Sequence, residues 1–490
     1  MVLRMAPLKV SITHGETRRL VVVSNRVPAL PVSGSGEEVR THPTGGLVSA
    51  LYPVMQQRGG LWFGWSGETT LRREFNTVRS RRLGSIDLVT VDLSEDVADE
   101  FYSGFCNRGL WPLFHSFTSH FKLRRDEYRT YQQVNHYFAS SLVPLLRKGD
   151  LVWVHDYHLI PLGFELHSLG WTDNIGFFLH TPFPPVDILI TLPWAGELLE
   201  HLLVYNLLGF HTQQYCRNFM EAACREVGGN FDGNTYCGAT SVRVGVYPIG
   251  TDPDTFEHWA NSPDAVRYGN RLRQIVQNRR IVLGVDRLDY TKGIPERLMA
   301  FEQFLVRYPS WHGRVSMIQI SAPSRSCVPE YTAQKREIDE LVGRINGRFS
   351  EDDWIPVHYW YRSFSQAELS AFYREADVCF VTPLRDGMNL VAKEYIASQT
   401  GEPGVLILSR FCGASENLRE ALIINPYDID GTAESLKRAL EMPLGERRYR
   451  RQALLKRVRT HTAQSWSNQF LADLIELSQM QRESIWRTVH

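Results

Sequence analysis

The chain has 490 residues, of which 43% are hydrophobic and 22% are charged, and its 54 lysines and arginines balance its 54 aspartates and glutamates. A chain of this length exceeds one ordinary hydrophobic core, so two domains with additional segments are expected. Zero net charge argues against a general nucleic-acid or membrane-surface binder, because those functions need a basic excess.

Apolar runs with strand character recur along the first half of the chain. They begin at residues 20 (LVVVS), 62 (WFGW), 87 (DLVTVDL), 151 (LVWVHD), 175 (IGFFLH), 206 (NLLGFHT) and 242 (VRVGVYPIG). Stretches with helical periodicity separate most of them, which predicts a parallel sheet built of βαβ units. Residues 1–17 are expected to form a loose tail. The long 28–44 segment, rich in Gly, Ser and Pro, is expected to be a mobile loop over a site.

The second half repeats this alternation. Further apolar runs begin at residues 281 (IVLGV), 315 (VSMIQIS), 356 (PVHYW), 378 (VCFVTP), 405 (VLILS) and 422 (LIINP). A turn-rich stretch at 247–254 divides the two sets of strands and is the predicted linker. We therefore predict domains over 18–250 and 251–460, and a terminal helix over 461–490 that packs back on the first domain. The arginine-rich stretch 447–459 is interpreted as a solvated helix face.

Residues 281–294, IVLGVDRLDYTKGI, are the most informative segment. A buried apolar run ends in a turn that carries Arg287 and Lys292, and helical spacing follows. The two cations are therefore expected in a strand-to-helix loop at the carboxyl edge of a parallel sheet, where ligands of open α/β folds bind. Two fixed positive charges there suit a diphosphate that gains charge as it leaves. Cations in loops are more often solvated surface charges, so the rest of the chain has to indicate whether these two bind a ligand.

A second loop of the same kind lies at 377–395, DVCFVTPLRDGMNLVAKEY. Asp386 is predicted at the N-terminus of the helix that follows the strand, with Gly387 next to it. Free backbone N–H groups at a helix start bind phosphate oxygens well. Glu394 lies about two turns further along, within reach of a pair of ribose hydroxyls. Two such loops in one chain favour a nucleotide-binding site.

Polar residues follow the ends of strands in both halves of the chain. The positions concerned are 24–26, 155–158, His180, Arg287, Arg325 and Asp386. If the two sheets face each other edge to edge, these residues converge on one cleft between the domains.

The cysteines and the N-terminus bear on the cellular compartment. The seven cysteines, at positions 106, 216, 224, 237, 327, 379 and 412, are odd in number and include no C-x-x-C pair. This pattern indicates neither a disulfide framework nor a zinc site and favours a reducing, cytoplasmic compartment. The first residues lack a secretory apolar core, and no apolar run approaches the roughly 18 residues that span a bilayer.

Many separated motifs resemble those of the trehalose-6-phosphate synthases, glycosyltransferase family 20. The match extends over residues 18–480 and includes the motifs VVVSNRVP, GGLWFGWSG, LWPLFHS, VWVHDYHLIPL, IGFFLHTPFPP, LLGFHT, VYPIGTDP, GVDRLDYTKGIPERL, ISAPSR, TPLRDGMNLVAKEY, LILSRFCGA and INPYD. The resemblance implies a GT-B fold, in which two Rossmann-like parallel-sheet domains face each other across a cleft, and a retaining glucosyl transfer.

The resemblance also implies roles for individual residues. Those matched to binding of glucose 6-phosphate, chiefly its phosphate, are Arg26, Tyr102, Trp111, Asp156 and Arg325. Those matched to binding of the nucleotide-glucose are Gly46, Arg287, Lys292, Asp386, Gly387, Met388, Asn389, Leu390 and Glu394. The implied catalytic set is Arg287, Lys292, Asp156 and His180.

Each residue also has a plain structural alternative. Tyr102 and Trp111 could be core aromatics, His180 a core histidine, and Asp156 a turn cap. The sequence departs from the family pattern at Asn206, where an aspartate is common and the role is structural. The string DIDGT at 428–432 imitates a phosphatase motif, which we reject because residues 425–427 interrupt the strand that motif needs.

The implied reaction joins a nucleotide-activated glucose to glucose 6-phosphate and yields trehalose 6-phosphate and a nucleoside diphosphate. It needs neither a metal nor another cofactor. UDP-glucose is the family's usual donor, and GDP- and ADP-glucose stay open. Its partners are these small molecules, with no nucleic acid or membrane, and a homo-oligomer stays open. The alternatives are a sibling transferase of the glucosylglycerol-phosphate synthase type, a non-catalytic regulator that binds sugar phosphates, and a phosphorolytic enzyme that carries pyridoxal phosphate.

Overall fold

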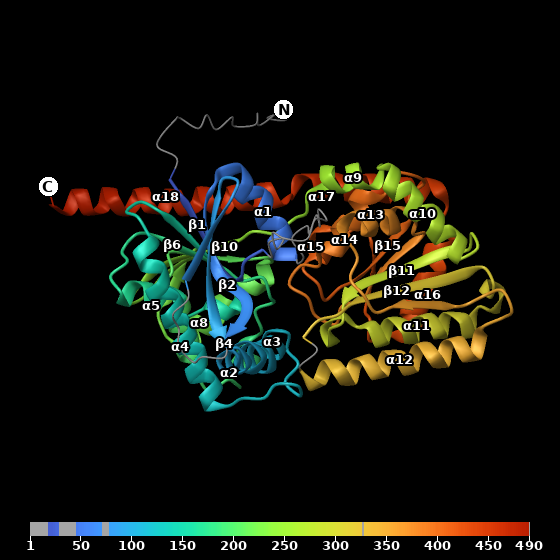
Figure 1. The fold of residues 1–490 in the computed structure, drawn as a ribbon, viewed down its shortest axis with the longest axis horizontal. Helices are drawn as coiled ribbons and strands as arrows, with labels where there is room; N and C mark the ends of the chain where they lie inside the picture. The colour runs from blue at the N-terminus through green and yellow to red at the C-terminus, as the bar shows by residue number, and fades with distance from the viewer. Residues whose placement is uncertain (1–17, 29–45, 71–77, 326–327, 490) are drawn as a thin grey trace.

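The computed structural model describes residues 18–28, 46–70, 78–325 and 328–489, which form two α/β lobes side by side (Figure 1). The first lobe carries a ten-stranded sheet and the second a six-stranded sheet. The predicted tail at 1–17 and all but the first residue of the predicted 28–44 loop lie outside the described residues.

The sheet of the first lobe has the strand order β3-β4-β2-β1-β5-β6-β7-β10-β9-β8. Its strands are β1 (Leu20–Arg26), β2 (Gly60–Thr70), β3 (Val78–Leu83), β4 (Ile86–Ser94), β5 (Leu151–His155), β6 (Ile175–Phe178), β7 (Leu207–Phe210), β8 (Asn230–Asp232), β9 (Thr235–Cys237) and β10 (Ser241–Val246). Every apolar run predicted for this half is a strand. The predicted parallel pairing is confirmed from β4 through β10, and three strands that were not predicted, β3, β8 and β9, pair antiparallel at the two edges. These edge strands are short and mostly polar, so they carry no buried-strand signal.

Helices cover both faces of the first sheet. They are α1 (Gly46–Arg58), α2 (Glu95–Ala98), the π-helix η1 (Asp99–Leu110), α3 (Trp111–Phe114), α4 (Arg125–Leu142), α5 (Leu162–Ser168), α6 (Val186–Leu189), α7 (Ala195–Leu202) and α8 (Gln213–Glu226). One hydrophobic core lies between the sheet and a layer that includes η1, α4, α7 and α8. The other face is covered by α1 and by the last helix of the chain.

The sheet of the second lobe is parallel throughout, in the order β13-β12-β11-β14-β15-β16. Its strands are β11 (Arg280–Arg287), β12 (Val315–Ala322), β13 (Val357–Trp360), β14 (Val378–Val381), β15 (Val405–Ser409) and β16 (Leu422–Ile424). These are the six runs expected from the sequence. Each is almost wholly apolar because helices bury both faces of the sheet.

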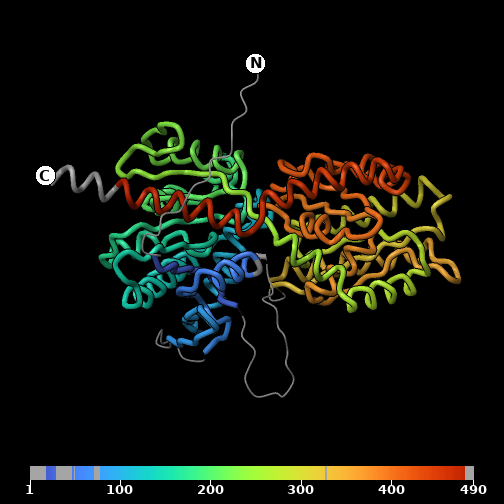
Figure 2. Tube along the Cα trace, turned by 90° about the horizontal axis from the view of Figure 1, so that it is seen from above, coloured from blue at the N-terminus to red at the C-terminus, as the bar shows by residue number. Residues whose placement is uncertain are grey.

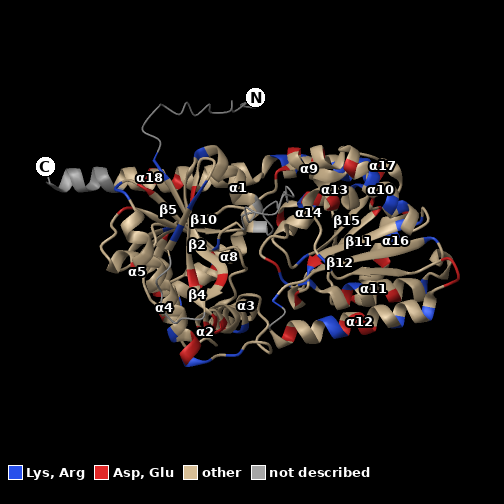
Figure 3. Ribbon diagram, in the orientation of Figure 1, with Lys and Arg blue, Asp and Glu red and all other residues tan. Residues whose placement is uncertain are grey.

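The helices of the second lobe form two layers (Figure 1). One face of the sheet carries α11 (Ile294–Arg307), α12 (Pro329–Phe349) and α16 (Ile429–Glu441). The other carries α9 (Pro253–Ala260), α10 (Pro263–Ile275), α13 (Gln366–Glu375), α14 (Leu390–Ser398) and α17 (Leu444–Thr460). The short α15 (Ala414–Asn417) follows β15. Both acidic and basic residues occur along α11 and α12 (Figure 3).

The last helix, α18 (Ala463–Val489), runs from the second lobe back over the first (Figure 2). Its Phe470 stacks on Trp153 of β5 with ring centroids 4.7 Å apart. A Cβ atom on Gly176 or Gly209 would lie 2.7 Å or 2.8 Å from the Phe470 ring, so the two glycines make room for this helix. The hydrophobic cluster under α18 continues into the second lobe, which makes one apolar core common to both.

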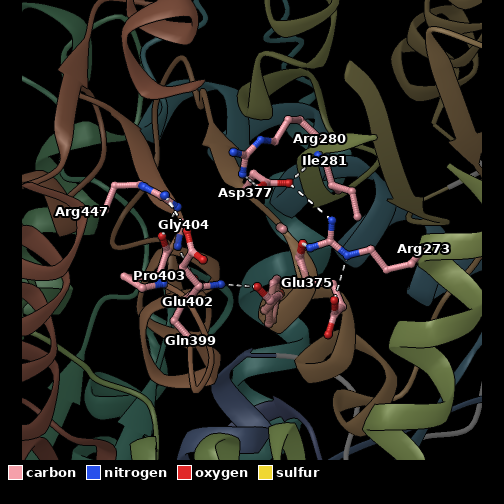
Figure 4. A network of polar contacts seen from close by, with 12 residues as sticks. Arg273, Arg280, Ile281, Glu375, Asp377, Gln399, Glu402, Pro403, Gly404 and Arg447 are labelled. Carbon is pink, nitrogen blue, oxygen red and sulfur yellow. Dashed lines mark hydrogen bonds and ion pairs between the residues drawn. The ribbon is translucent and has the colours of Figure 1, made fainter. Parts of the chain in front are cut away.

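A polar network closes the edge of the second sheet at which its strands begin (Figure 4). Arg280, the first residue of β11, pairs with Asp377, and Arg273 of α10 pairs with Glu375 at the end of α13. Asp377 also accepts the backbone N–H of Ile281 at 2.8 Å. These bonds tie two helices and a strand together at the edge opposite the carboxyl ends of the strands.

The arginine-rich stretch 447–459 lies on α17, but it is not simply solvated as predicted. Arg447 pairs with Glu402 at 2.7 Å, Arg457 with Glu420 at 2.7 Å, and Arg459 with Glu257 at 2.6 Å. The acidic partners come from other parts of the second lobe, so sequence spacing within the helix did not reveal them. No helix in the described part of the chain has the length and apolar content that a membrane span requires.

Candidate active site

Both sheets contain a point where the strand order reverses, and the predicted site residues lie there. In the first sheet the reversal falls between β1 and β5, and in the second between β11 and β14. Arg26 ends β1, Asp156 follows β5, and Arg287 ends β11. Loops diverge at such a point and leave a crevice at the carboxyl ends of the strands, which is where ligands of open α/β sheets bind.

Aromatic rings of the first lobe hold Arg26 in place. Its guanidinium carbon lies 4.3 Å from the ring centroid of Trp65 and 5.3 Å from that of Tyr102. A Cβ atom on Gly67 would lie 2.7 Å from its Nη1, so a larger residue at position 67 would displace the arginine. Tyr102 lies in the π-helix η1, a kind of helix that is frequent at functional sites. Burial raises the pKa of Tyr102, but Arg325, Arg26 and Arg287 outweigh burial and leave the pKa lowered.

Trp111, in the first lobe, is contacted by two cations of the second lobe. The guanidinium carbon of Arg325 lies 3.9 Å from its ring centroid, and that of Arg287 lies 5.8 Å away. Cations within about 6 Å of an indole face are attracted by its quadrupole. The four residues Arg26, Tyr102, Trp111 and Arg325 therefore meet, as their shared role in the resemblance requires, and Arg287 joins them.

Arg287 differs in its exposure from Lys292 and Arg325, the other two cations that the second lobe contributes to the site. It is an exposed residue, and it forms no ion pair with any described residue. Lys292, by contrast, is buried, and its Nζ lies 2.6 Å from Oδ2 of Asp386. An anionic ligand would meet the full charge of Arg287 but would share Lys292 with a carboxylate.

Asp156 and His180 lie side by side at the ends of β5 and β6. The backbone N–H of His180 donates to Oδ1 of Asp156 at 3.1 Å, and Asp156 has φ 76°, a strained conformation for a residue other than glycine. Burial raises the pKa of Asp156 to about 6, although Arg325 and Arg287 oppose the shift. Burial, with His155 and His211 adding to it, holds the pKa of His180 well below its usual value, so its ring is neutral.

The loop before α14 departs from the prediction at its helix start. The helix begins at Leu390, and its N-cap is Asn389, whereas the sequence reading put the helix start at Asp386. Asn389 has φ 74°, and its side chain accepts the N–H of Ala392 and donates to Asp386 at 3.1 Å. The helix starts later than predicted because Asn389 tolerates a backbone with positive φ and caps the helix with its side chain. Met388, which precedes it, is buried.

Gly387 is the point where this loop meets the first lobe. A Cβ atom on Gly387 would lie 2.0 Å from the backbone oxygen of His180. Beside it, the hydroxyl of Tyr215 donates to the backbone oxygen of Asp386 at 3.0 Å. The absence of a side chain at residue 387 therefore allows the two lobes to approach each other at His180.

Glu394 lies in the second turn of α14, in a half-buried position. The hydroxyl of Tyr373 donates to its Oε2 at 3.1 Å. Burial raises the pKa of Glu394 to about 7. Gly46 begins α1, which places it at a helix N-terminus on the first lobe, where backbone N–H groups are free to bind an anion.

Sequence reasoning missed several residues that shape the site. Asp289 and Tyr331 both bond to Arg325, and His115 packs at a tilt against Trp111 with ring centroids 4.0 Å apart. Asp289 stands only two residues after Arg287 in the segment singled out above, so its place in that cation-bearing turn was the available signal. His115 lies within the motif LWPLFHS quoted above, whereas Tyr331 lies in none of the quoted motifs, because only the fold brings it to Arg325. No cluster of three or more potential metal-ligating side chains occurs among residues 18–28, 46–70, 78–325 and 328–489.

Comparison with known proteins gives consistent matches along nearly the whole chain. The model of glycosyltransferase family 20 matches residues 18–476. The trehalose-6-phosphate synthase of Sinorhizobium fredii is 42% identical over 460 residues, which cover 93% of this chain and 98% of the relative.

Solved structures agree with these sequence matches. An alpha,alpha-trehalose-phosphate synthase (UDP-forming) from Burkholderia xenovorans in complex with glucose-6-phosphate is 39% identical, with a TM-score of 0.88 and coverage of 93% of this chain and 99% of that one. An E. coli structure bound with UDP-2-fluoro glucose is 38% identical, with a TM-score of 0.86 and coverage of 93% and 98%.

Proposed function

The chain belongs to glycosyltransferase family 20, and from that premise we propose that it transfers glucose, with retention, from a nucleotide-glucose to glucose 6-phosphate. The products are trehalose 6-phosphate and a nucleoside diphosphate. The two lobes form the GT-B fold, as the sequence predicted. UDP-glucose is the proposed donor, because relatives are named as UDP-forming enzymes and one solved relative is bound with a UDP-glucose analogue.

One observation carries this proposal. Arg26 of the first lobe lies on Tyr102, and Arg325 and Arg287 of the second lobe lie on Trp111. All three guanidinium groups are near enough to Tyr102 to lower its pKa. Three guanidinium groups in one crevice are suited to two phosphorylated ligands, a sugar phosphate and a nucleoside diphosphate, held next to each other. A protein that only bound a single anion would not need cations from both lobes at the points where the strand order of each sheet reverses.

The proposed chemistry follows from where charge develops. As the bond from the sugar to the diphosphate breaks, negative charge grows on the leaving oxygen, and Arg287 and Lys292 stabilise it. The backbone N–H groups of 387–390 lie in the same loop and add to this effect. Asp156 and the neutral ring of His180 border the place where the two sugars meet. Contact between the lobes at Gly387 excludes water, which limits hydrolysis of the donor.

We further propose that no metal ion takes part. Magnesium commonly neutralises a leaving diphosphate, and Arg287 and Lys292 supply positive charge for that purpose here. Turnover is therefore expected to stay unchanged when EDTA is added to a metal-free assay, and a loss that Mg²⁺ restores would contradict this part of the proposal. The scattered cysteines support a cytoplasmic location.

The direct test is a product assay with purified protein. UDP-, GDP- and ADP-glucose are each offered with glucose 6-phosphate and with glycerol 3-phosphate, and the products are identified by mass spectrometry. We expect trehalose 6-phosphate, formed fastest from UDP-glucose. A product only with glycerol 3-phosphate would indicate the sibling transferase, and binding without turnover would indicate a regulator.

Substitution of Arg325 tests the acceptor side. Arg325→Ala removes a buried guanidinium that lies on Trp111, and charged hydrogen bonds contribute about 1.5–3 kcal/mol each. The KM for glucose 6-phosphate is expected to rise about 10- to 100-fold, with a smaller change in the KM for the nucleotide-glucose. Steady-state kinetics with each substrate varied in turn measures both values. An unchanged acceptor KM would contradict the role of Arg325.

The raised pKa of Glu394 predicts how donor binding depends on pH. With its pKa at about 7, the carboxyl is mostly protonated at pH 6 and mostly ionised at pH 8. The ionised form accepts hydrogen bonds from ribose hydroxyls, so the KM for the nucleotide-glucose should fall by up to about tenfold from pH 6 to pH 8. Glucose 6-phosphate is kept saturating, because its own phosphate titrates near pH 6.

The control for this pH dependence is Glu394→Gln, which keeps the shape and cannot ionise. We expect a weaker donor affinity whose pH dependence is flat over the same range. A pH dependence that persists in Glu394→Gln would assign the effect to another group.

A further inference from the structure

Arg325 is held by two residues to which neither the resemblance nor the comparisons assign a role. Its Nη1 donates to Oδ2 of Asp289 at 3.2 Å and to the hydroxyl of Tyr331 at 2.5 Å. The Tyr331 hydroxyl in turn donates to the same carboxylate oxygen at 3.2 Å. The three groups form a closed triangle of hydrogen bonds around one nitrogen of the guanidinium.

The side chain of Asp289 is held in place by hydrogen bonds that do not involve Arg325. It is the N-cap of the short 3-10 helix η4 (Tyr290–Lys292), and its Oδ1 accepts both the backbone N–H and the hydroxyl of Thr291, at 3.0 Å and 2.9 Å. The carboxylate is completely buried. Burial raises its pKa, but Arg325, Arg287 and Lys292 outweigh burial and leave the pKa lowered, so the group is ionised. Its Oδ2 thus presents a fixed negative charge to Arg325.

Tyr331 is fixed from other directions. It lies in the first turn of α12 and is buried, and its ring packs edge-on against Tyr290 at 5.5 Å. Tyr290 stacks on His120 of the first lobe at 4.8 Å. Next to Tyr331, Glu330 pairs with Lys122 of the first lobe at 2.8 Å. The segment that carries Tyr331 is therefore docked against the opposite lobe.

The arrangement leaves one edge of the guanidinium unused. Nε of Arg325 is buried and has no hydrogen-bond partner among the described residues. The side chain is 6% exposed, so this donor is withdrawn from bulk water. A buried donor without a partner is destabilising, which points to a ligand as the source of the missing acceptor. The backbone of Arg325 is also strained, at φ 45°.

We propose that Asp289 and Tyr331 are positioning residues, which hold Arg325 on Trp111 with its Nε free to bind the acceptor phosphate. The inference rests on the proposed function, since it concerns the acceptor site of that reaction. An arginine side chain loses much rotamer freedom when it binds a ligand, and holding Nη1 in advance removes most of that cost. When the lobes come together, Arg325 is then already oriented toward the acceptor-binding residues of the first lobe.

A carboxylate beside a phosphate site repels the phosphate to some extent, but its removal would cost more. A buried guanidinium without a counter-charge is destabilising, because no attractive interaction offsets the loss of its hydration. Asp289 supplies the counter-charge, and it does so through Nη1 of Arg325 alone. Arg287 and Lys292 are also near enough to lower the pKa of Asp289, so its charge is shared among several cations.

The experiment uses Tyr331→Phe, which removes only the hydroxyl and keeps the buried ring. Glucose 6-phosphate is titrated calorimetrically into the wild type and the variant, and steady-state kinetics gives kcat and both KM values. We expect glucose 6-phosphate to bind about tenfold more weakly, while kcat and the KM for the nucleotide-glucose change by less than about twofold. The matched control is Tyr205→Phe. It removes a buried hydroxyl that bonds Gly163 and the carbonyl of Leu159 in the first lobe, and should leave every constant unchanged.

A double substitution separates positioning from general stability. If Tyr331 acts through Arg325, Tyr331→Phe should have no further effect on glucose 6-phosphate binding in the Arg325→Ala background. Additive effects, or an unchanged affinity in the single variant, would overturn the inference while product formation by the wild type continued to support the proposed function. Wild-type protein that neither binds nor converts glucose 6-phosphate would overturn both.

Discussion

Arg287→Ala is expected to lower kcat by roughly 10²–10³ while the protein stays folded. Arg287 ends β11 as an exposed residue, and its guanidinium lies 5.8 Å from the Trp111 ring without an ion pair to any described residue. Its guanidinium is therefore not tied up in an ion pair and can meet the departing diphosphate, whereas Lys292 is paired with Asp386. Loss of Arg287 removes a preorganised charge whose effect is greatest in the transition state.

The measurement is kcat with both substrates saturating, together with thermal unfolding of the variant. The matched control is Arg280→Ala, at the other end of the same strand, where the arginine pairs with Asp377 (Figure 4). That control should keep kcat within about twofold. Near-normal turnover in Arg287→Ala would remove this residue from the proposed mechanism.

Gly387→Ala is expected to lower kcat about 100-fold by keeping the lobes apart. The new Cβ would lie 2.0 Å from the backbone oxygen of His180, and a backbone oxygen cannot move aside as a flexible side chain can. Gly413 crowds the other side, because a Cβ placed there would lie 2.2 Å from the backbone oxygen of Gly387. Misplacement of reacting groups by about 1 Å commonly costs about 10²-fold in rate.

Kinetics and thermal unfolding distinguish a closure defect from a folding defect. The clash lies where the lobes meet, so the melting temperature should fall by only a few degrees while kcat collapses. Gly343→Ala in α12 is the control, because a Cβ there has no neighbour within 4 Å. Retained turnover in Gly387→Ala would show that close approach at His180 is not required for transfer.

The elements of the fold were predictable because their signals are local. Every apolar run singled out in the sequence is a strand, since a strand covered by helices on both faces needs apolar side chains at nearly every position. The strands that were missed, β3, β8 and β9, lie at the edges of the first sheet. They are short, largely exposed and polar, and their pairing depends on neighbours rather than on their own residues.

The candidate site was predictable in part for the same reason. Arg26, Asp156, His180 and Arg287 all follow strands, and parallel strands bring their carboxyl ends to one edge. The helix start near Asp386 was misplaced because Asn389 adopts a left-handed backbone and caps α14 four residues before Lys393. Such a conformation is stabilised by the surrounding loop and leaves no periodic signal in the sequence.

The sequence by itself determined the buried strands and the polar residues that stand at their ends, because hydrophobic periodicity and strand-end placement are properties of short stretches of chain. Only the tertiary structure decided which side chains meet. It brought Arg325 onto Trp111, 214 positions away in the chain, and placed Asp289 and Tyr331 around it. It also decided the ionisation of Asp156 and Glu394, because burial and neighbouring charges, which shift these pKa values, exist only once distant segments pack together.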